Sequence, residues 1–191
     1  SNIMLTADGH LCLADFGLCA QLTAENSWHT TGNVGTVGYQ APEIVARKPY
    51  TFTVDLFALG VTIYRLITGK RPYGKEGKFD KPVKYRYFSP VLINLLEGLL
   101  RLNPDERLGS VHNIQDSYNT GVDWYPIKAH KWFEDIDWKA MKNKLINPPL
   151  YGSIMGTRSF KDNLTLNFPQ SISLKKSKNN AKKKKRGPPL P

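Results

Sequence analysis

Cysteine and long hydrophobic runs are both scarce in this 191-residue sequence. Its two cysteines, Cys12 and Cys19, are too few for the disulfide framework of a small secreted domain, and they lack the paired spacing of a zinc site. The longest apolar stretch, residues 54–67, is too short and too interrupted to span a bilayer, and the chain opens without a signal-peptide pattern. We therefore expect a cytoplasmic protein rather than a secreted or membrane-spanning one.

Acidic residues are missing from the end of the chain. Of the 27 lysines and arginines, eight fall in residues 175–191, where there is no aspartate or glutamate, so the rest of the chain has 19 basic against 16 acidic residues. A segment this basic and this poor in apolar residues cannot build a core. We expect residues 175–191 to be a disordered polybasic tail.

The basic tail has two candidate partners. One is an anionic membrane surface, which attracts each nearby basic residue by about 1 kcal/mol, and the other is a nuclear import receptor. No aromatic residue interrupts the cluster to give a base a stacking surface, so no specific nucleic acid is expected. A nuclear or membrane-peripheral location is then an alternative to a cytoplasmic one, and a solvated tail without a partner is a further alternative. The cluster consists of Lys182, Lys183, Lys184, Lys185 and Arg186.

Hydrophobic periodicity predicts a mainly α protein with one short hairpin. Residues 3–5 and 11–13 are predicted strands joined by an Asp8-Gly9 turn, and residues 18–38 have no sustained period, which is typical of a long irregular loop. Residues 53–69 are apolar around the whole helical repeat, so we expect a helix that other parts of the protein surround. Further helices are predicted from Pro42, over residues 89–100 with Ser89 as N-cap, within residues 103–109, and as short pieces in residues 124–141.

Four short motifs follow one another along the chain. Asp15-Phe16-Gly17 comes at the end of the second predicted strand, and it is followed by GTVGYQAPE (35–43), DLFALG (55–60) and NPDERLG (103–109). In this order, and with Asn2 ahead of the hairpin, the motifs resemble those of the protein kinase family. The resemblance implies a protein-kinase-like α+β fold, of which this chain is the mainly α carboxy-terminal lobe with its short β-hairpin and without the amino-terminal lobe.

Asp15, Asn2 and Thr36 are the predicted catalytic residues. Transfer of a phosphoryl group needs a metal ion that bridges phosphate oxygens, and Mg²⁺ prefers hard oxygen ligands from one or two carboxylates. Within the resemblance, Asp15 and Asn2 are the metal ligands and Thr36 is the threonine whose hydroxyl contacts the catalytic base. The resemblance also implies that residues 37–39 shape the pocket after the phosphorylated residue. ATP and Mg²⁺ are the implied cofactors. The alternative for Asp15 is a loop aspartate whose carboxylate accepts a turn amide.

Three further charged residues are predicted to be structural. Glu43 and Arg107 resemble the family's buried ion pair, which is costly to break because one charge is then left uncompensated. Asp55 is the one acid of the apolar helix and needs hydrogen-bond donors. In the family the equivalent aspartate accepts backbone amides of the catalytic loop; alternatively, Asp55 favours the positive end of the helix dipole.

The end of the lobe resembles the AGC group of basophilic serine/threonine kinases. The resemblance rests on residues 130–150, HKWFEDIDWKAMKNKLINPPL, and on the NPDERLG motif. In that group a tail phenylalanine reaches the adenine pocket, and Phe160 is the candidate here, although Lys161 and Asn163 depart from the usual neighbours. Leu18 resembles the large residue that accompanies a preference for serine over threonine acceptors.

Two features of AGC regulation are altered in this sequence. Gly32 stands where the activating phosphothreonine is expected, so either Thr31 or Thr30 is the phosphosite or activation does not use this position. The tail also lacks a Phe-x-x-Phe hydrophobic motif, because LNFPQSIS contains one aromatic residue.

The sequence predicts three segments: a partial kinase catalytic domain (1–133), an AGC-like tail (134–174) and the polybasic tail (175–191). Neither a G-x-G-x-x-G loop nor a His-Arg-Asp occurs in these 191 residues. We expect a full-length enzyme that transfers the ATP γ-phosphoryl group to protein serine or threonine, and a chain that is inactive alone. Its expected partners are a protein substrate and the missing amino-terminal lobe, without which large apolar side chains around residues 57–67 would be exposed. The alternative is a catalytically dead interaction protein that uses the lobe and basic tail for docking.

Overall fold

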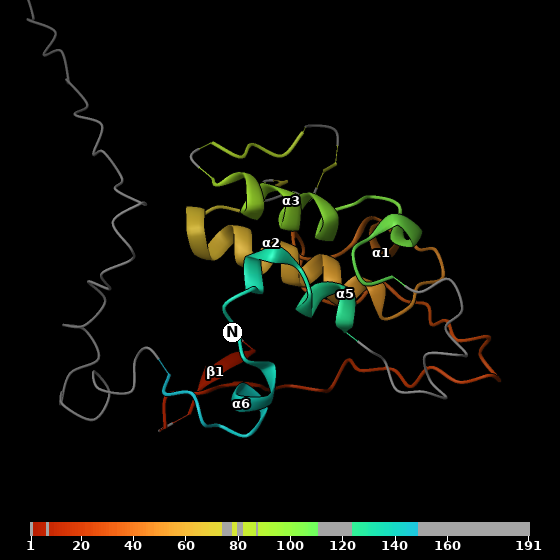
Figure 1. Cartoon of the computed structure of the whole chain (residues 1–191). Coiled ribbons are helices and arrows are strands. Elements are labelled where there is room, and N and C mark those ends of the chain that lie inside the picture. The colour runs from red at the N-terminus through yellow and green to blue at the C-terminus, as the bar shows by residue number, and fades with distance from the viewer. Residues whose placement is uncertain are drawn as a thin grey trace, which may run out of the picture. The chain divides into compact units, whose positions relative to one another are not determined.

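The structure is a computed structural model that describes residues 2–6, 8–73, 78–79, 82–86, 88–110 and 124–148. The chain divides into two compact units, Ser1–Gly156 and Thr157–Pro191, and every element described here belongs to the first (Figure 1). In chain order the elements are β1 (Ile3–Leu5), β2 (Leu11–Leu13), α1 (Pro42–Val45), α2 (Thr53–Thr68), α3 (Pro90–Leu99), the 3₁₀-helix η1 (Pro104–Glu106), α5 (Tyr125–Lys128), the 3₁₀-helix η2 (Lys131–Phe133) and α6 (Trp138–Lys142). The predicted mainly α character with one short hairpin is confirmed.

The hairpin forms where the sequence predicts it. β1 and β2 are antiparallel, with Ile3 opposite Leu13 and Leu5 opposite Leu11. Gly9 occupies the turn with a φ of 82°, a left-handed conformation that glycine adopts without steric cost. The turn places Asp8 at one end of the hairpin and leaves the other end open, where the chain enters β1 and leaves β2.

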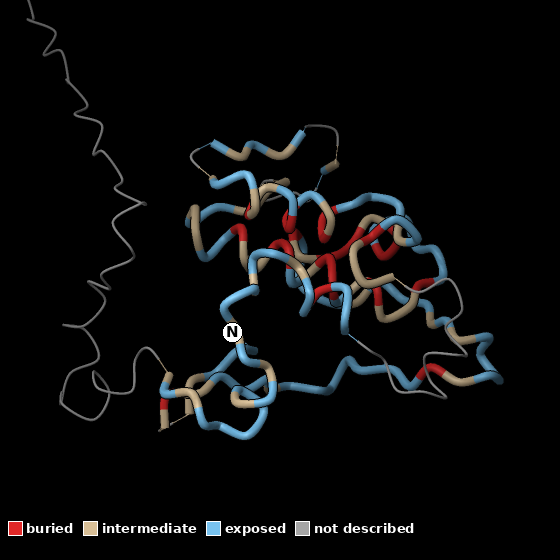
Figure 2. Tube along the Cα trace, in the orientation of Figure 1, coloured by how far each residue is buried: buried red, intermediate tan, exposed pale blue. Residues whose placement is uncertain are grey.

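The core lies between α2 and α3. Phe57 and Val61 on α2 and Leu96 on α3 are at most 1% exposed. The helices approach closely at Gly60, where an added Cβ would lie 3.0 Å from side-chain atoms of both Leu99 and Leu100. The buried residues in Figure 2 gather in this helical part, whereas the chain between β2 and α1 is largely exposed.

Local capping signals set the ends of the long helices. α3 starts at Pro90, and Ser89 Oγ accepts a hydrogen bond from the Leu92 amide at 3.2 Å. α2 ends at Thr68 and is capped by Gly69, whose φ is 70° and whose amide donates to the Arg65 carbonyl at 2.8 Å. The observed bounds therefore agree with the predicted ones, because both caps depend on residues next to the helix.

One face of α2 is uncovered within the described residues. Leu59 is 39% exposed and Leu66 is 76% exposed, although the sequence marks the helix as apolar on every side. Phe57 on the same helix is 1% exposed, so the exposure predicted around residues 57–67 is found at Leu59 and Leu66 and not at Phe57. α2 has 16 residues, and no helix in the described ranges is long and apolar enough to cross a membrane.

Candidate active site

Asn2 and Asp15 lie together at the open end of the hairpin. Asn2 directly precedes β1, and Asp15 follows the end of β2 by two residues. The Ala14 amide donates to the Asn2 carbonyl at 2.8 Å, and Asn2 Nδ2 donates to Asp15 Oδ2 at 3.4 Å. Both side chains are exposed. The structure thus brings together the two residues that the sequence predicts as metal ligands.

Asp15 has a left-handed backbone, with a φ of 66°. This region is uncommon for residues with a Cβ, although aspartate tolerates it better than most. Gly17 follows closely enough that a Cβ added there would lie 3.4 Å from Asp15 Oδ1. Backbone strain of this kind is found where the surrounding structure fixes the direction of a functional side chain. Here that direction is toward Asn2.

The donor set of this site fits a hard divalent cation that also binds a nucleotide. Asp15 offers a carboxylate and Asn2 offers a carboxamide oxygen. Among the described residues, no hydrogen-bond donor reaches Asn2 Oδ1, so this oxygen is available to a cation. Mg²⁺ in nucleotide sites takes one or two protein ligands of this kind and completes its shell with phosphate oxygens and water. The described residues contain no group of three or more His, Cys, Asp and Glu side chains that could hold a metal by themselves.

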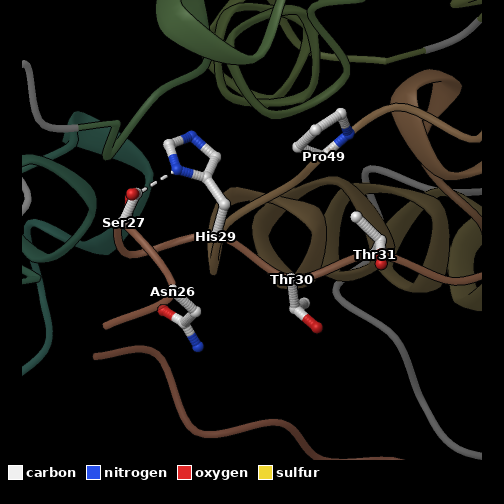
Figure 3. A pocket seen from close by; sticks show the side chains of 6 residues that line it. All are labelled: Asn26, Ser27, His29, Thr30, Thr31 and Pro49. Carbon is white, nitrogen blue, oxygen red and sulfur yellow. Dashed lines mark hydrogen bonds between the residues drawn. The ribbon is translucent and has the colours of Figure 1, made fainter. Parts of the chain in front are cut away.

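The loop between β2 and α1 contains the two predicted phosphosites and borders an open pocket of about 650 Å³ (Figure 3). Thr30 forms an antiparallel bridge with Tyr50 and is partly buried, whereas Thr31 is exposed. His29 Nδ1 lies 2.6 Å from the Ser27 carbonyl oxygen, a contact that Figure 3 marks. Of the two threonines, Thr31 is therefore the more accessible. The pocket is lined by Asn26, Ser27, His29, Thr30, Thr31 and Pro49.

Thr36 lies in an exposed turn beside an aromatic residue that two arginines flank. The Thr36 carbonyl accepts the Tyr39 amide at 3.0 Å. The guanidinium carbons of Arg65 and Arg71 lie 5.7 and 5.4 Å from the centre of the Tyr39 ring. Neither arginine was among the predicted site residues. A signal for one of them was present, because Arg65 is the one basic residue in the apolar helix α2.

Glu43 and Arg107 form a buried, two-pronged ion pair. Arg107 Nη1 donates to Glu43 Oε1 at 2.8 Å and Arg107 Nη2 donates to Glu43 Oε2 at 3.1 Å. Further bonds run from Nη1 to the Thr53 carbonyl at 2.7 Å and from Nε to the Arg101 carbonyl at 3.1 Å. Arg107 is 1% exposed, and its guanidinium carbon lies 5.2 Å from the centre of the Phe57 ring. The pair ties α1 to the start of α2 and to the chain after η1.

Asp55 lies in the first turn of α2 without a hydrogen-bond donor for its carboxylate among the described residues. Burial against its neighbours raises the pKa of this carboxyl above its ordinary value, although the residue as a whole is exposed. Its position favours a negative charge through the helix dipole, as the alternative interpretation holds. The role in bonding catalytic-loop amides stays a prediction.

Two predicted functional segments lie outside the described residues. These are Phe160, the candidate for the adenine pocket, and the basic cluster from Lys182 to Arg186. The segment boundaries at residues 133 and 174 likewise stay predictions.

Comparison with known proteins gives a match to one family model. Residues 1–119 match the protein kinase domain. This match confirms the predicted fold class, since the described helices and the single two-stranded sheet are those of part of a kinase fold.

Curated serine/threonine kinases align with most of the chain. The serine/threonine-protein kinase AtPK2/AtPK19 of Arabidopsis thaliana is 34% identical over 162 residues, which cover 81% of this chain and 32% of that protein. Sgk1 of Rattus norvegicus is 33% identical over 162 residues, covering 81% of this chain and 35% of that protein. Protein kinase C of Drosophila melanogaster is 35% identical over 156 residues, which cover 78% of this chain and 20% of that protein. The chain thus spans about a third or less of the length of these AGC-type relatives.

Proposed function

Because the chain belongs to the protein kinase domain family, we propose that it is part of an enzyme that transfers the γ-phosphoryl group of ATP to serine or threonine hydroxyl groups of proteins. The observation that carries the proposal is the contact between Asn2 and Asp15 at the open end of the hairpin. The contact places a carboxylate beside a carboxamide. Side-chain oxygens of these two kinds are the ligands that Mg²⁺, when bound to a nucleotide, takes from a protein. The serine/threonine kinases among the relatives support the acceptor class.

The proposed roles of Asp15 and Asn2 follow from the positions of their side chains, and those of Thr36 and Phe160 follow from the resemblance to the kinase family. Asp15 provides a negative charge fixed by its left-handed backbone, and Asn2 holds that carboxylate in place while offering its own oxygen. Asp15 and Asn2 would hold Mg²⁺, which would supply positive charge against the phosphates during transfer. Thr36, in the exposed turn, positions the catalytic base, and Phe160 covers the adenine. We assign regulation by phosphorylation to Thr31, the exposed threonine of the loop.

The 191-residue chain is proposed to be inactive alone, because the phosphate-covering glycine loop and the His-Arg-Asp base are not in its sequence. We propose a cytoplasmic enzyme whose polybasic tail meets an anionic membrane surface or a nuclear import receptor. The exposed apolar side chains of the lobe, such as Leu13 and Leu66, favour a second candidate function, a catalytically dead interaction protein. In that case the lobe and the basic tail would be docking surfaces.

The test is phosphoryl transfer by the protein that carries this chain together with its preceding kinase sequence. Asp15→Asn keeps the size of the side chain and removes its charge, so we expect the rate at saturating magnesium–ATP to fall by about 100-fold or more. The matched control is Asp135→Asn, an exposed aspartate after η2 that should leave the rate unchanged.

Equal rates for the parent and Asp15→Asn would remove Asp15 from the proposed role. Absence of transfer in the parent protein, with nucleotide binding also absent, would favour the interaction protein.

A further inference from the structure

Two arginines flank Tyr39 in the turn that begins at Thr36. Arg65 comes from the last turn of α2, and Arg71 follows the end of that helix by three residues. Arg65 Nη1 donates to the Tyr39 hydroxyl, and Arg71 Nη1 donates to the Val37 carbonyl at 2.9 Å. Both guanidinium groups lie within cation–π distance of the Tyr39 ring. The contacts fix two positive charges on one short segment, residues 37–39.

A glycine makes the approach of Arg71 possible. Gly38 is buried and has a φ of 85°, and a Cβ added there would lie 2.7 Å from both Cδ and Nη1 of Arg71. Any larger residue at this position would therefore displace Arg71 from the Val37 carbonyl. The glycine thus allows both the turn and the contact with Arg71.

Arg65 is the side chain of this cluster that is open to solvent. It is exposed, and among the described residues no carboxylate lies within ion-pair distance of it. Compensation of the negative end of the α2 dipole accounts for a basic residue in the last turn. It does not account for a guanidinium that reaches Tyr39, 26 residues away in sequence. A guanidinium has five donors in a planar fork, so Arg65 keeps donors for an anion after bonding the tyrosine.

We propose that Arg65, braced on Tyr39 beside Arg71, binds an anionic side chain of the acceptor protein next to the residue that is phosphorylated, and we call this site the anion seat. The inference rests on the proposed kinase function and on the predicted role of residues 37–39 in shaping the pocket after the phosphorylated residue. It gives the enzyme acidic acceptor sites, in contrast to the basic sites that its AGC resemblance implies. A carboxylate or a phosphate supplies the same paired oxygens to a guanidinium.

The first test measures binding and needs no catalysis. Fluorescence anisotropy compares four serine peptides on the 191-residue chain, which differ only in the residues beside the serine: alanine, glutamate, phosphoserine or arginine. We expect the glutamate peptide to bind at least about tenfold more tightly than the alanine peptide, as for charge-assisted hydrogen bonds. Arg65→Glu should remove that preference, whereas Lys139→Glu, an exposed charge change of the same size on α6, should keep it.

Each outcome decides the proposal. Tighter binding of phosphoserine than of glutamate identifies phosphate as the anion and supports the anion seat. The proposal would be overturned if the glutamate and alanine peptides bound equally or if the arginine peptide bound more tightly. It would also be overturned if Arg65→Glu and Lys139→Glu reduced the preference for glutamate equally.

A second test separates this inference from the proposed function. The protein with its preceding kinase sequence is assayed for phosphoryl transfer to the glutamate and arginine peptides. Transfer that favours the arginine peptide would leave the kinase function standing and overturn the anion seat. If no peptide is phosphorylated, the kinase function fails, and the binding comparison still decides the anion seat.

Discussion

Arg107 is the largest of the side chains that are fully buried in the core, and its charge is compensated by an ion pair with Glu43. Taking an ion pair out of water is costly, so such a pair is stabilising only while all its hydrogen bonds are made. Here the guanidinium bonds two carboxylate oxygens and two backbone carbonyls. The residue thus holds three separate stretches of chain together.

Removal of one partner should be severe. In Glu43→Ala the guanidinium stays buried without a counter-charge, and we expect the free energy of unfolding to fall by about 3–5 kcal/mol. In Glu43→Gln, which keeps one acceptor oxygen, the free energy of unfolding should fall less. Urea denaturation followed by circular dichroism measures both, with exposed Glu134→Ala as the control. A Glu43→Ala loss no larger than that of the control would contradict the account of this pair.

Single residues also show where sequence-based prediction stops. The contact of Asn2 with Asp15 and the pairing of Glu43 with Arg107 followed from motif order, because the motifs carry the arrangement of a known family. The left-handed backbone of Asp15 was not predicted, since aspartate has several local conformations and tertiary contacts select one. The Tyr39 cluster was missed because Arg71 bonds a carbonyl 34 residues away, which no local pattern encodes.

Among the elements, the hairpin turn is joined to the chain after α6. Lys144 Nζ lies 3.1 Å from Asp8 Oδ2, and His10 Nδ1 lies 3.4 Å from the same oxygen. Thr6 Oγ1 donates to Asp8 Oδ1. The hydrogen bond from Thr6, followed by that from Lys144, lowers the pKa of Asp8 well below its ordinary value. The ionised carboxylate is the form that fastens the turn.

This contact should depend on pH in the acid range. Because the folded pKa of Asp8 is below the unfolded value of about 3.9, its stabilisation is complete above that value and is lost as the pH falls through the folded pKa. Between pH 5 and pH 2 we expect hydrogen-exchange protection of the Gly9 amide to decrease. Asp8→Asn should show low protection throughout and little change with pH. Protection that falls equally in both proteins would assign the effect to another group.

Helix bounds were the part of the fold most accessible from the sequence. Ser89, Pro90 and Gly69 are local signals, and the ends they predict are those observed. What covers α2 was not accessible in the same way. The apolar pattern shows that a face needs a partner, but the partner is a matter of tertiary structure.

For the whole molecule, the feature that stands out is the apolar surface left uncovered. Leu11, Leu13, Phe16 and Leu18 are each at least 64% exposed, and Leu66 of α2 is 76% exposed. Burial of one such side chain is worth about 1.5–3 kcal/mol. We propose that the rest of the kinase domain covers this surface.

The 191-residue chain should therefore bind a dye specific for apolar surfaces. We expect strong fluorescence of anilinonaphthalene sulfonate with this chain, and a several-fold weaker signal per molecule when the preceding kinase sequence is present. Leu13→Ser combined with Leu66→Ser should weaken the signal of the short chain. A long protein as fluorescent as the short one would show that these faces stay open.

The central claim is that Asp15 and Asn2 hold a divalent cation together with ATP, and metal binding tests it most directly. Mn²⁺ can replace Mg²⁺ at oxygen ligands, and its electron paramagnetic resonance signal distinguishes free from bound metal. The measurement is a titration of Mn²⁺ and a non-hydrolysable ATP analogue into the protein that carries the preceding kinase sequence. The account predicts binding that weakens at least about tenfold in Asp15→Asn, weakens less in Asn2→Ala, and is unchanged in Asp135→Asn. Parent-like Mn²⁺ binding in both Asp15→Asn and Asn2→Ala would contradict it.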